Sequence, residues 1–132
     1  MDLSLRLLEW VRLLHILGAE KVYMYELKVH PNVAQLFDYL ESQNLIEVVP
    51  LTLPGFQPNL HLLRSLYLQR MMGVKRLNEI IPYNDCLYRN LYRYNFIVLL
   101  DIDEVLMPTS SYSWAGLMQQ IQSIINLNKP KV

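Results

Sequence analysis

Apolar positions along the chain recur at two different spacings, and these predict an alternation of helices and strands. Segments with the 3.6-residue period of a helix buried on one face include residues 3–17, 31–40 and 113–127. Shorter apolar runs with the length of strands occupy residues 21–25, 45–51 and 96–100. The order of these elements favours an α/β fold, a three-layer sandwich with a mostly parallel sheet.

The middle of the chain has a less regular pattern. Residues 52–77 are the hardest to assign, although Leu60 to Met72 has the length of a helix that is apolar almost all round. A clearer helix is expected to begin at Tyr83, with Asn84 or Asp85 as its N-cap, because short polar side chains accept hydrogen bonds from free N–H groups at helix starts.

The composition excludes several classes of protein for this chain. A chain of 132 residues, 52% hydrophobic and 18% charged, suits a single domain with a buried core rather than a disordered segment. Twelve basic and twelve acidic residues leave no positive excess for a nucleic-acid partner. No stretch of eighteen or more apolar residues occurs, so no segment is expected to span a bilayer. Cys86 is the single cysteine, which excludes an internal disulfide.

An acidic cluster, Asp101-Ile102-Asp103-Glu104, follows the apolar run 96–100. In an extended segment Asp101 and Asp103 would project to the same side. Ligands bind at the carboxyl ends of parallel strands, and paired carboxylates suit a hard cation such as Mg²⁺ or Mn²⁺. The alternative is a solvated turn whose acids cap the following segment, and the pattern alone leaves both interpretations open.

Two groups of residues together resemble glycosyltransferase family 92, formerly a domain of unknown function. The first group is Leu8-Glu9-Trp10-Val11 with His15, Gly18 and Val22-Tyr23-Met24-Tyr25. The second is Tyr83-Asn84-Asp85-Cys86-Leu87-Tyr88-Arg89 followed by Leu100-Asp101-Ile102-Asp103-Glu104-Val105. The resemblance runs over essentially the whole chain, and the second group is the more specific.

The resemblance implies a partial GT-A fold and metal-dependent transfer of a sugar, galactose, from a nucleotide sugar to a glycan or glycoprotein acceptor. The implied cofactors are Mn²⁺ (or Mg²⁺) and UDP-galactose. Carried over by position, Asp103 is the direct metal ligand, and Asp101 reaches the ribose or a metal-bound water. Asn84 and Asp85 are expected to line the donor pocket. The implied location is the lumenal side of the Golgi membrane, through an anchor that is absent from this chain.

Some features of the family pattern are absent. The family's first strand, before residue 3, and the acceptor-binding part after the acidic cluster have no counterpart, and Glu26-Leu27 stands where the family often has Asp-Asn. We therefore expect residues 1–132 to be a single truncated domain, a fragment without measurable transfer activity, whose general base is not identified.

Two other functions stay open. A phosphatase of the haloacid dehalogenase type also ends an apolar strand with Asp-x-Asp, with Asp101 as nucleophile and Asp103 as acid and base. That class normally carries the motif on its first strand. A catalytically inactive binding domain, with an open sheet edge, is the non-enzymatic alternative.

Three other residues with possible chemistry are expected to be structural. Trp10 and Cys86 lie at inward helical positions typical of core residues. His15 has no partner at a metal-binding spacing, so a packed or edge histidine is expected.

Overall fold

The computed structural model describes residues 2–127. The helices and strands within this range follow one another as α1 (Ser4–Leu17), β1 (Val22–Glu26), α2 (Pro31–Ser42), β2 (Ile46–Pro50), α3 (His61–Arg70), α4 (Met72–Asn90) and α5 (Trp114–Leu127). None of the helices in this range is both long and apolar enough to cross a lipid bilayer.

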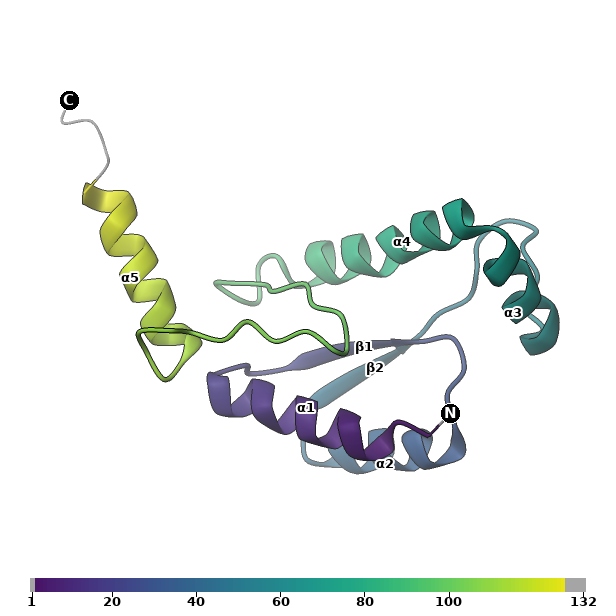
Figure 1. Cartoon of the computed structure of the whole chain (residues 1–132), viewed down its shortest axis with the longest axis horizontal. Coiled ribbons are helices and arrows are strands. Elements are labelled where there is room, and N and C mark those ends of the chain that lie inside the picture. Colours follow the sequence, from purple (N-terminus) through teal and green to yellow (C-terminus); the bar gives the residue numbers. More distant parts are fainter. Residues whose placement is uncertain (1, 128–132) are drawn as a thin grey trace.

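The strands β1 and β2 form a parallel pair, with Val22 opposite Ile46 and Glu26 opposite Pro50. The helix α2 connects them, as parallel strands require a crossover. Helices α1 and α2 cover one face of this pair, α4 passes over the other face, and α5 extends away to one side (Figure 1). The fold is mixed α/β, as predicted, with helices on both faces of the sheet.

The core lies between the strands and the first two helices. The α1 side chains buried there are spaced as predicted: Leu7, Val11, Leu14 and Leu17. Val33, Phe37 and Leu40 of α2 and Ile46 of β2 complete it, while Leu36 is half-buried. Val11 and Leu40 are fully buried.

Local signals in the sequence set several helix ends. Gly18 adopts a left-handed conformation, with φ of 113°, and its N–H bonds to the carbonyls of Leu14 and His15, which ends α1. Pro31 occupies the first turn of α2, where its missing N–H costs nothing. Ser113 caps α5, because its Oγ accepts the backbone N–H of Gly116 at 3.3 Å.

The predicted start of the fourth helix was wrong. Helix α4 begins at Met72, not at Tyr83, and continues through Pro82. Asn84 and Asp85 therefore lie inside α4 and cap nothing. Proline removes one backbone hydrogen bond from the helix. The turn before it is anchored independently, because the buried Asn78 side chain bonds to the side chain of Gln57 at 2.8 Å.

The predicted strand at residues 96–100 is also absent, and the sheet of the described residues has only β1 and β2. A strand requires a neighbouring strand that accepts and donates its ladder hydrogen bonds. The apolar run at 96–100 has no such neighbour within residues 2–127, and a cavity separates it from β1.

Candidate functional site

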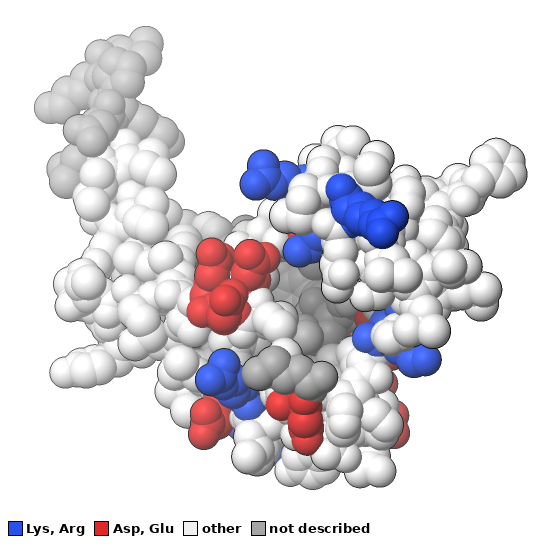
Figure 2. All heavy atoms as spheres, turned by 45° about the vertical axis from the view of Figure 1, so that its right-hand side comes forward, with Lys and Arg blue, Asp and Glu red and all other residues white. Residues whose placement is uncertain are grey.

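The acidic cluster forms a turn instead of the extended segment predicted from the sequence. The backbone N–H of Glu104 donates to the carbonyl of Asp101 at 2.9 Å, and the Glu104 carboxylate accepts the Asp101 N–H at 3.3 Å. The side chains of Asp101, Asp103 and Glu104 are exposed, and acidic side chains gather on one face of the molecule (Figure 2). The alternation argument that placed Asp101 and Asp103 on one side of a strand does not apply to a turn.

Residues from two helices hold this turn in place. The indole N–H of Trp10, on α1, donates to the carbonyl of Glu104 at 2.7 Å. The hydroxyl of Tyr83, on α4, donates to Asp101 Oδ1 at 2.7 Å. The indole N–H of Trp114, at the start of α5, holds the same loop further on through the carbonyl of Leu106 at 2.7 Å. The turn therefore lies where α1, α4 and α5 approach the same loop.

Asp101 and Asp103 have different surroundings. Asp101 is bound to Tyr83, whereas Asp103 lines a small pocket of about 190 Å³ with Leu3, Arg6 and Ile102. The hydrogen bond to Asp101, together with burial, raises the pKa of Tyr83 to about 12. Tyr83 therefore keeps its proton at neutral pH and remains a donor to the carboxylate.

The donor set of the turn suits a hard divalent cation, because carboxylate oxygens are the ligands that Mg²⁺ and Mn²⁺ prefer. Asp101 has a second oxygen, Oδ2, that the Tyr83 bond leaves available. Within residues 2–127, however, no three His, Cys, Asp or Glu side chains are close enough to form a complete metal site. The described residues therefore supply at most part of the ligand set of a cation.

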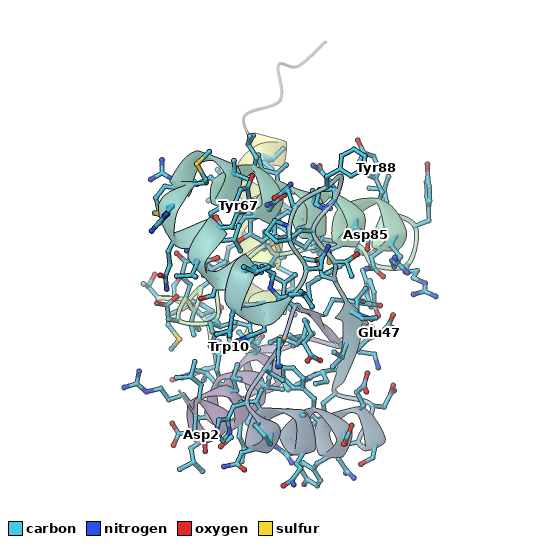
Figure 3. All side chains as sticks on the ribbon, turned by 90° about the vertical axis from the view of Figure 1, so that its right-hand side faces the viewer. Asp2, Trp10, Glu47, Tyr67, Asp85 and Tyr88 are labelled. Carbon is cyan, nitrogen blue, oxygen red and sulfur yellow. The ribbon has the colours of Figure 1, made fainter. Side chains whose placement is uncertain are left out.

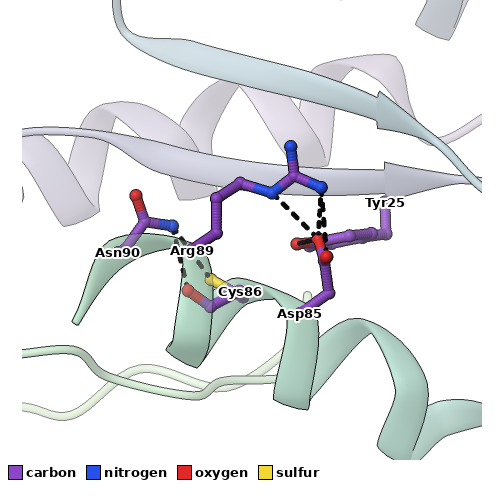
Figure 4. Close-up of polar contacts among 5 residues, drawn as sticks. All are labelled: Tyr25, Asp85, Cys86, Arg89 and Asn90. Atoms are coloured by element: carbon purple, nitrogen blue, oxygen red, sulfur yellow. Dashed lines mark hydrogen bonds and ion pairs between the residues drawn. The ribbon is translucent and has the colours of Figure 1, made fainter.

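A second polar cluster joins α4 to β1. The hydroxyl of Tyr25 donates to Asp85 Oδ2 at 2.6 Å, and Arg89 donates to both Asp85 oxygens, at 3.1 and 3.0 Å (Figure 4). These bonds lower the pKa of Asp85, with Arg89 the larger cause, while burial and the Asp85 bond raise the pKa of Tyr25. Asp85 is thus an anionic link between the helix and the sheet.

A cavity of about 580 Å³ lies between β1, α4 and the loop that leads to the acidic turn. The side chains that α4 contributes to its wall are Pro82, Tyr83, Cys86 and Asn90. Asn84 and Asp85, expected to line a donor pocket, do not line this cavity. In Figure 3, Asp85 lies on the side of α4 that faces the strands, and Tyr88 is on the outer side.

One buried atom in this wall has no partner. Asn90 is 1% exposed, and its Nδ2 donates to the carbonyl of Cys86 at 3.0 Å. Its Oδ1 accepts no hydrogen bond from the described residues. Burial raises the pKa of the neighbouring Cys86 thiol, so it stays protonated and is a poor nucleophile.

Comparison with known proteins identifies the family of the chain. The family model described as glycosyltransferase family 92 matches residues 2–126. The chain belongs to glycosyltransferase family 92. No curated protein and no solved structure matches it. The match covers both groups of residues in which the resemblance was found.

The family relationship assigns the general function of this family 92 domain, which is that of a glycosyltransferase. It implies a nucleotide-sugar donor and a glycan acceptor. Because the match includes the acidic turn and the α4 cluster in one alignment, it favours a transferase over the phosphatase alternative. That alternative rested on residues 96–105 alone.

The sequence did not reveal the residues that organise the site of the family 92 domain. Trp10, expected in the core, is half-buried and holds the acidic turn. Tyr25 and Asp85 are 60 residues apart in sequence, so no local pattern indicates their contact. His15 is an edge histidine as expected, because its Nε2 lies 2.9 Å from the carbonyl of Leu45, next to β2.

Proposed function

We propose that this family 92 domain binds UDP-galactose through a divalent cation and serves the transfer of galactose to a glycan or glycoprotein. The proposal includes a partial GT-A fold and a location on the lumenal side of the Golgi membrane. The observation that supports it is the exposed acidic turn, within the residues that the family model matches, held by Trp10 and Tyr83 beside a cavity of nucleotide size.

Both aspartates of the turn have a role in this proposal. Asp103 would hold Mn²⁺ or Mg²⁺ directly, and Asp101 would reach the ribose or a metal-bound water. A cation bound there neutralises charge on the diphosphate as it leaves. Tyr83 and Trp10 orient the turn, so that the carboxylates need little rearrangement to bind.

The proposed binding of the nucleotide-sugar donor can be tested with UDP. Its affinity for the purified chain is measured by calorimetry with and without Mn²⁺. We expect UDP to bind at least about tenfold more tightly with Mn²⁺, a difference of about 1.4 kcal/mol. Asp103→Asn should remove the Mn²⁺ dependence. Asp38→Asn, at an exposed aspartate on α2, is the matched control and should keep it.

Two results would contradict the proposal. One is UDP binding of equal strength in the presence and absence of Mn²⁺. The other is an Asp103→Asn protein that binds UDP and Mn²⁺ as the unchanged chain does. Release of phosphate from p-nitrophenyl phosphate, dependent on Asp101, would instead support the phosphatase.

A further inference from the structure

The small pocket beside the acidic turn is lined by two side chains of opposite charge. Its volume is about 190 Å³, and its wall includes Arg6 of α1 and Asp103 of the turn, with the apolar side chains of Leu3, Leu7 and Ile102. In Figure 2 basic side chains lie immediately beside the acidic group, on the same face. Ile102 also lines the cavity of about 580 Å³, so the pocket and the cavity are neighbours.

Neither charge of this pocket is neutralised by an ion pair with a described residue. The ion pairs found within residues 2–127 lie inside α4, and neither Arg6 nor Asp103 takes part in one. Both side chains are exposed. The guanidinium and the carboxylate therefore keep their capacity to bind a ligand that carries both signs of charge.

The acidic residues nearest to Arg6 in sequence bind elsewhere or not at all. Asp2 accepts the backbone N–H of Ser4 on Oδ1 at 3.0 Å and the side-chain amide of Asn32 on Oδ2 at 2.6 Å. Glu9, one turn further along α1, is exposed and forms no ion pair with Arg6. Side chains three or four positions apart on a helix can reach one another. The lack of such a pair leaves the Arg6 guanidinium available at the pocket.

Opposite charges in one pocket suit a phosphate group that is bridged to a cation. Arginine binds phosphate oxygens through parallel N–H donors, and a carboxylate is a ligand for a hard divalent cation. A simple anion in the pocket would be repelled by Asp103, and a simple cation by Arg6. A diphosphate that carries a divalent cation avoids both repulsions, because each of its charges meets the opposite charge of the wall.

The position of Arg6 distinguishes the two phosphates of such a ligand. In the proposed function Asp103 holds the cation, and Asp101, which is bound to Tyr83 of α4, lies on the side of the ribose. Arg6 shares its pocket with Asp103 and not with Asp101. From the ribose, the nucleotide therefore passes the cation before it reaches Arg6, which places the distal phosphate, the one that bears the sugar, at this side chain.

We propose that Arg6 binds the distal phosphate of the nucleotide-sugar donor and makes the site select a diphosphate over a monophosphate. The guanidinium of Arg6 would donate to oxygens of that phosphate from the side opposite Asp103. This inference rests on the proposed function, and it adds a residue of α1 to a site that the family pattern located in the acidic turn.

The test compares ligands that have and lack the distal phosphate. The affinities of UDP, UMP and inorganic pyrophosphate are measured by calorimetry with Mn²⁺ present, for the unchanged chain and for Arg6→Gln. Arg6→Gln should weaken the binding of UDP and pyrophosphate at least about tenfold, because charged hydrogen bonds to the distal phosphate are lost. Binding of UMP, which lacks this phosphate, should weaken less than about threefold.

Two further variants separate this contact from the general loss of a positive charge. Arg70→Gln, at an exposed arginine in the last turn of α3, removes the same charge and should leave all three affinities within about twofold. Arg6→Lys keeps the charge without the paired donors, so it should weaken UDP binding less than Arg6→Gln does. Because Arg6 and Arg70 are exposed, the variants should melt at the temperature of the unchanged chain.

The inference is overturned if Arg6→Gln binds UDP as tightly as the unchanged chain. Equal weakening of UDP and UMP also contradicts it, because Arg6 would then act on a part that both ligands share. Weakening of pyrophosphate alone would mean that the pocket takes a free diphosphate instead of a nucleotide. These outcomes differ from failure of the proposed function, in which the unchanged chain binds UDP without dependence on Mn²⁺ or not at all, and the inference falls with it.

Discussion

Residues 4–50 and residues 61–127 differ in what their elements bury. In the first region, α1, β1, α2 and β2 share one apolar core that includes Val11, Leu40 and Ile46. In the second region, the buried residues of α3 and α4 are polar: Arg64, Asn78 and Asn90. Many large apolar side chains there are exposed instead, among them Leu62, Leu63, Leu66, Leu77, Ile80, Ile124 and Ile125.

This difference indicates where stability comes from. Burial of apolar surface is the main favourable term in folding, at about 25 cal/mol per Å². The elements of the first region bury apolar surface against one another. The second contacts the first through polar links, such as Tyr25 to Asp85 and Tyr23 to Tyr94, and through Leu100, Val105 and Trp114, which pack against the core of the first.

The largest effect is expected from removing core volume in the first region. Leu40→Ala should lower the free energy of unfolding by about 2–5 kcal/mol, because Leu40 is fully buried. Leu62→Ala, on α3, should change it by less than about 0.5 kcal/mol, since Leu62 is 74% exposed. Urea denaturation of both variants measures the contrast. Equal losses would mean that the second region has a core of its own.

A smaller effect should distinguish the two buried asparagines of α4. Asn78 exchanges hydrogen bonds with Gln57 at 2.8 and 3.4 Å, so Asn78→Leu should cost about 1–3 kcal/mol. Asn90→Leu loses the Nδ2 bond to the Cys86 carbonyl but also removes an acceptor that has no partner, so it should cost less than about 1 kcal/mol. Thermal unfolding of the two variants provides the comparison.

Sequence reasoning also succeeded to different degrees in the two regions. The elements of the first region were predicted closely, because their signals act within a few residues of the chain. These signals are Gly18, Pro31 and the spacing of Leu7, Val11 and Leu14. Residues 96–100 have the composition of a strand, but a strand exists only with a neighbour, and composition does not show whether one is present. Asn84 and Asp85 predicted a helix start near Tyr83, but α4 runs from Met72 through Pro82, and the Asn78–Gln57 pair holds the turn before that proline.

The candidate site shows the same limit. The family pattern located Asp101 and Asp103 in the sequence, and the match over residues 2–126 confirmed the family. It could not show that Tyr83 would bond to Asp101 or that Trp10 would hold Glu104, because these contacts join residues that are 18 and 94 positions apart. Whether the two aspartates bind a metal stays a prediction.

The smallest effect concerns Tyr23, which links the two regions, and Tyr83, which holds the acidic turn, and it is confined to alkaline pH. Burial and the hydroxyl of Tyr94 raise the pKa of Tyr23 from 10.0 to about 12, and the Asp101 bond raises that of Tyr83 to a similar value. A raised pKa in the folded state gives stability that is complete below pH 10 and is lost as pH rises toward 12, because the unfolded chain releases its protons first. The free energy of unfolding should therefore fall across this range, and less steeply in Tyr23→Phe and Tyr83→Phe. Tyr92→Phe, at an exposed ring, is the control for loss of a hydroxyl. If all three variants had the same slope, Tyr23 would not be the link between the regions, and Tyr83 would not be the anchor of the acidic turn, that their hydrogen bonds indicate.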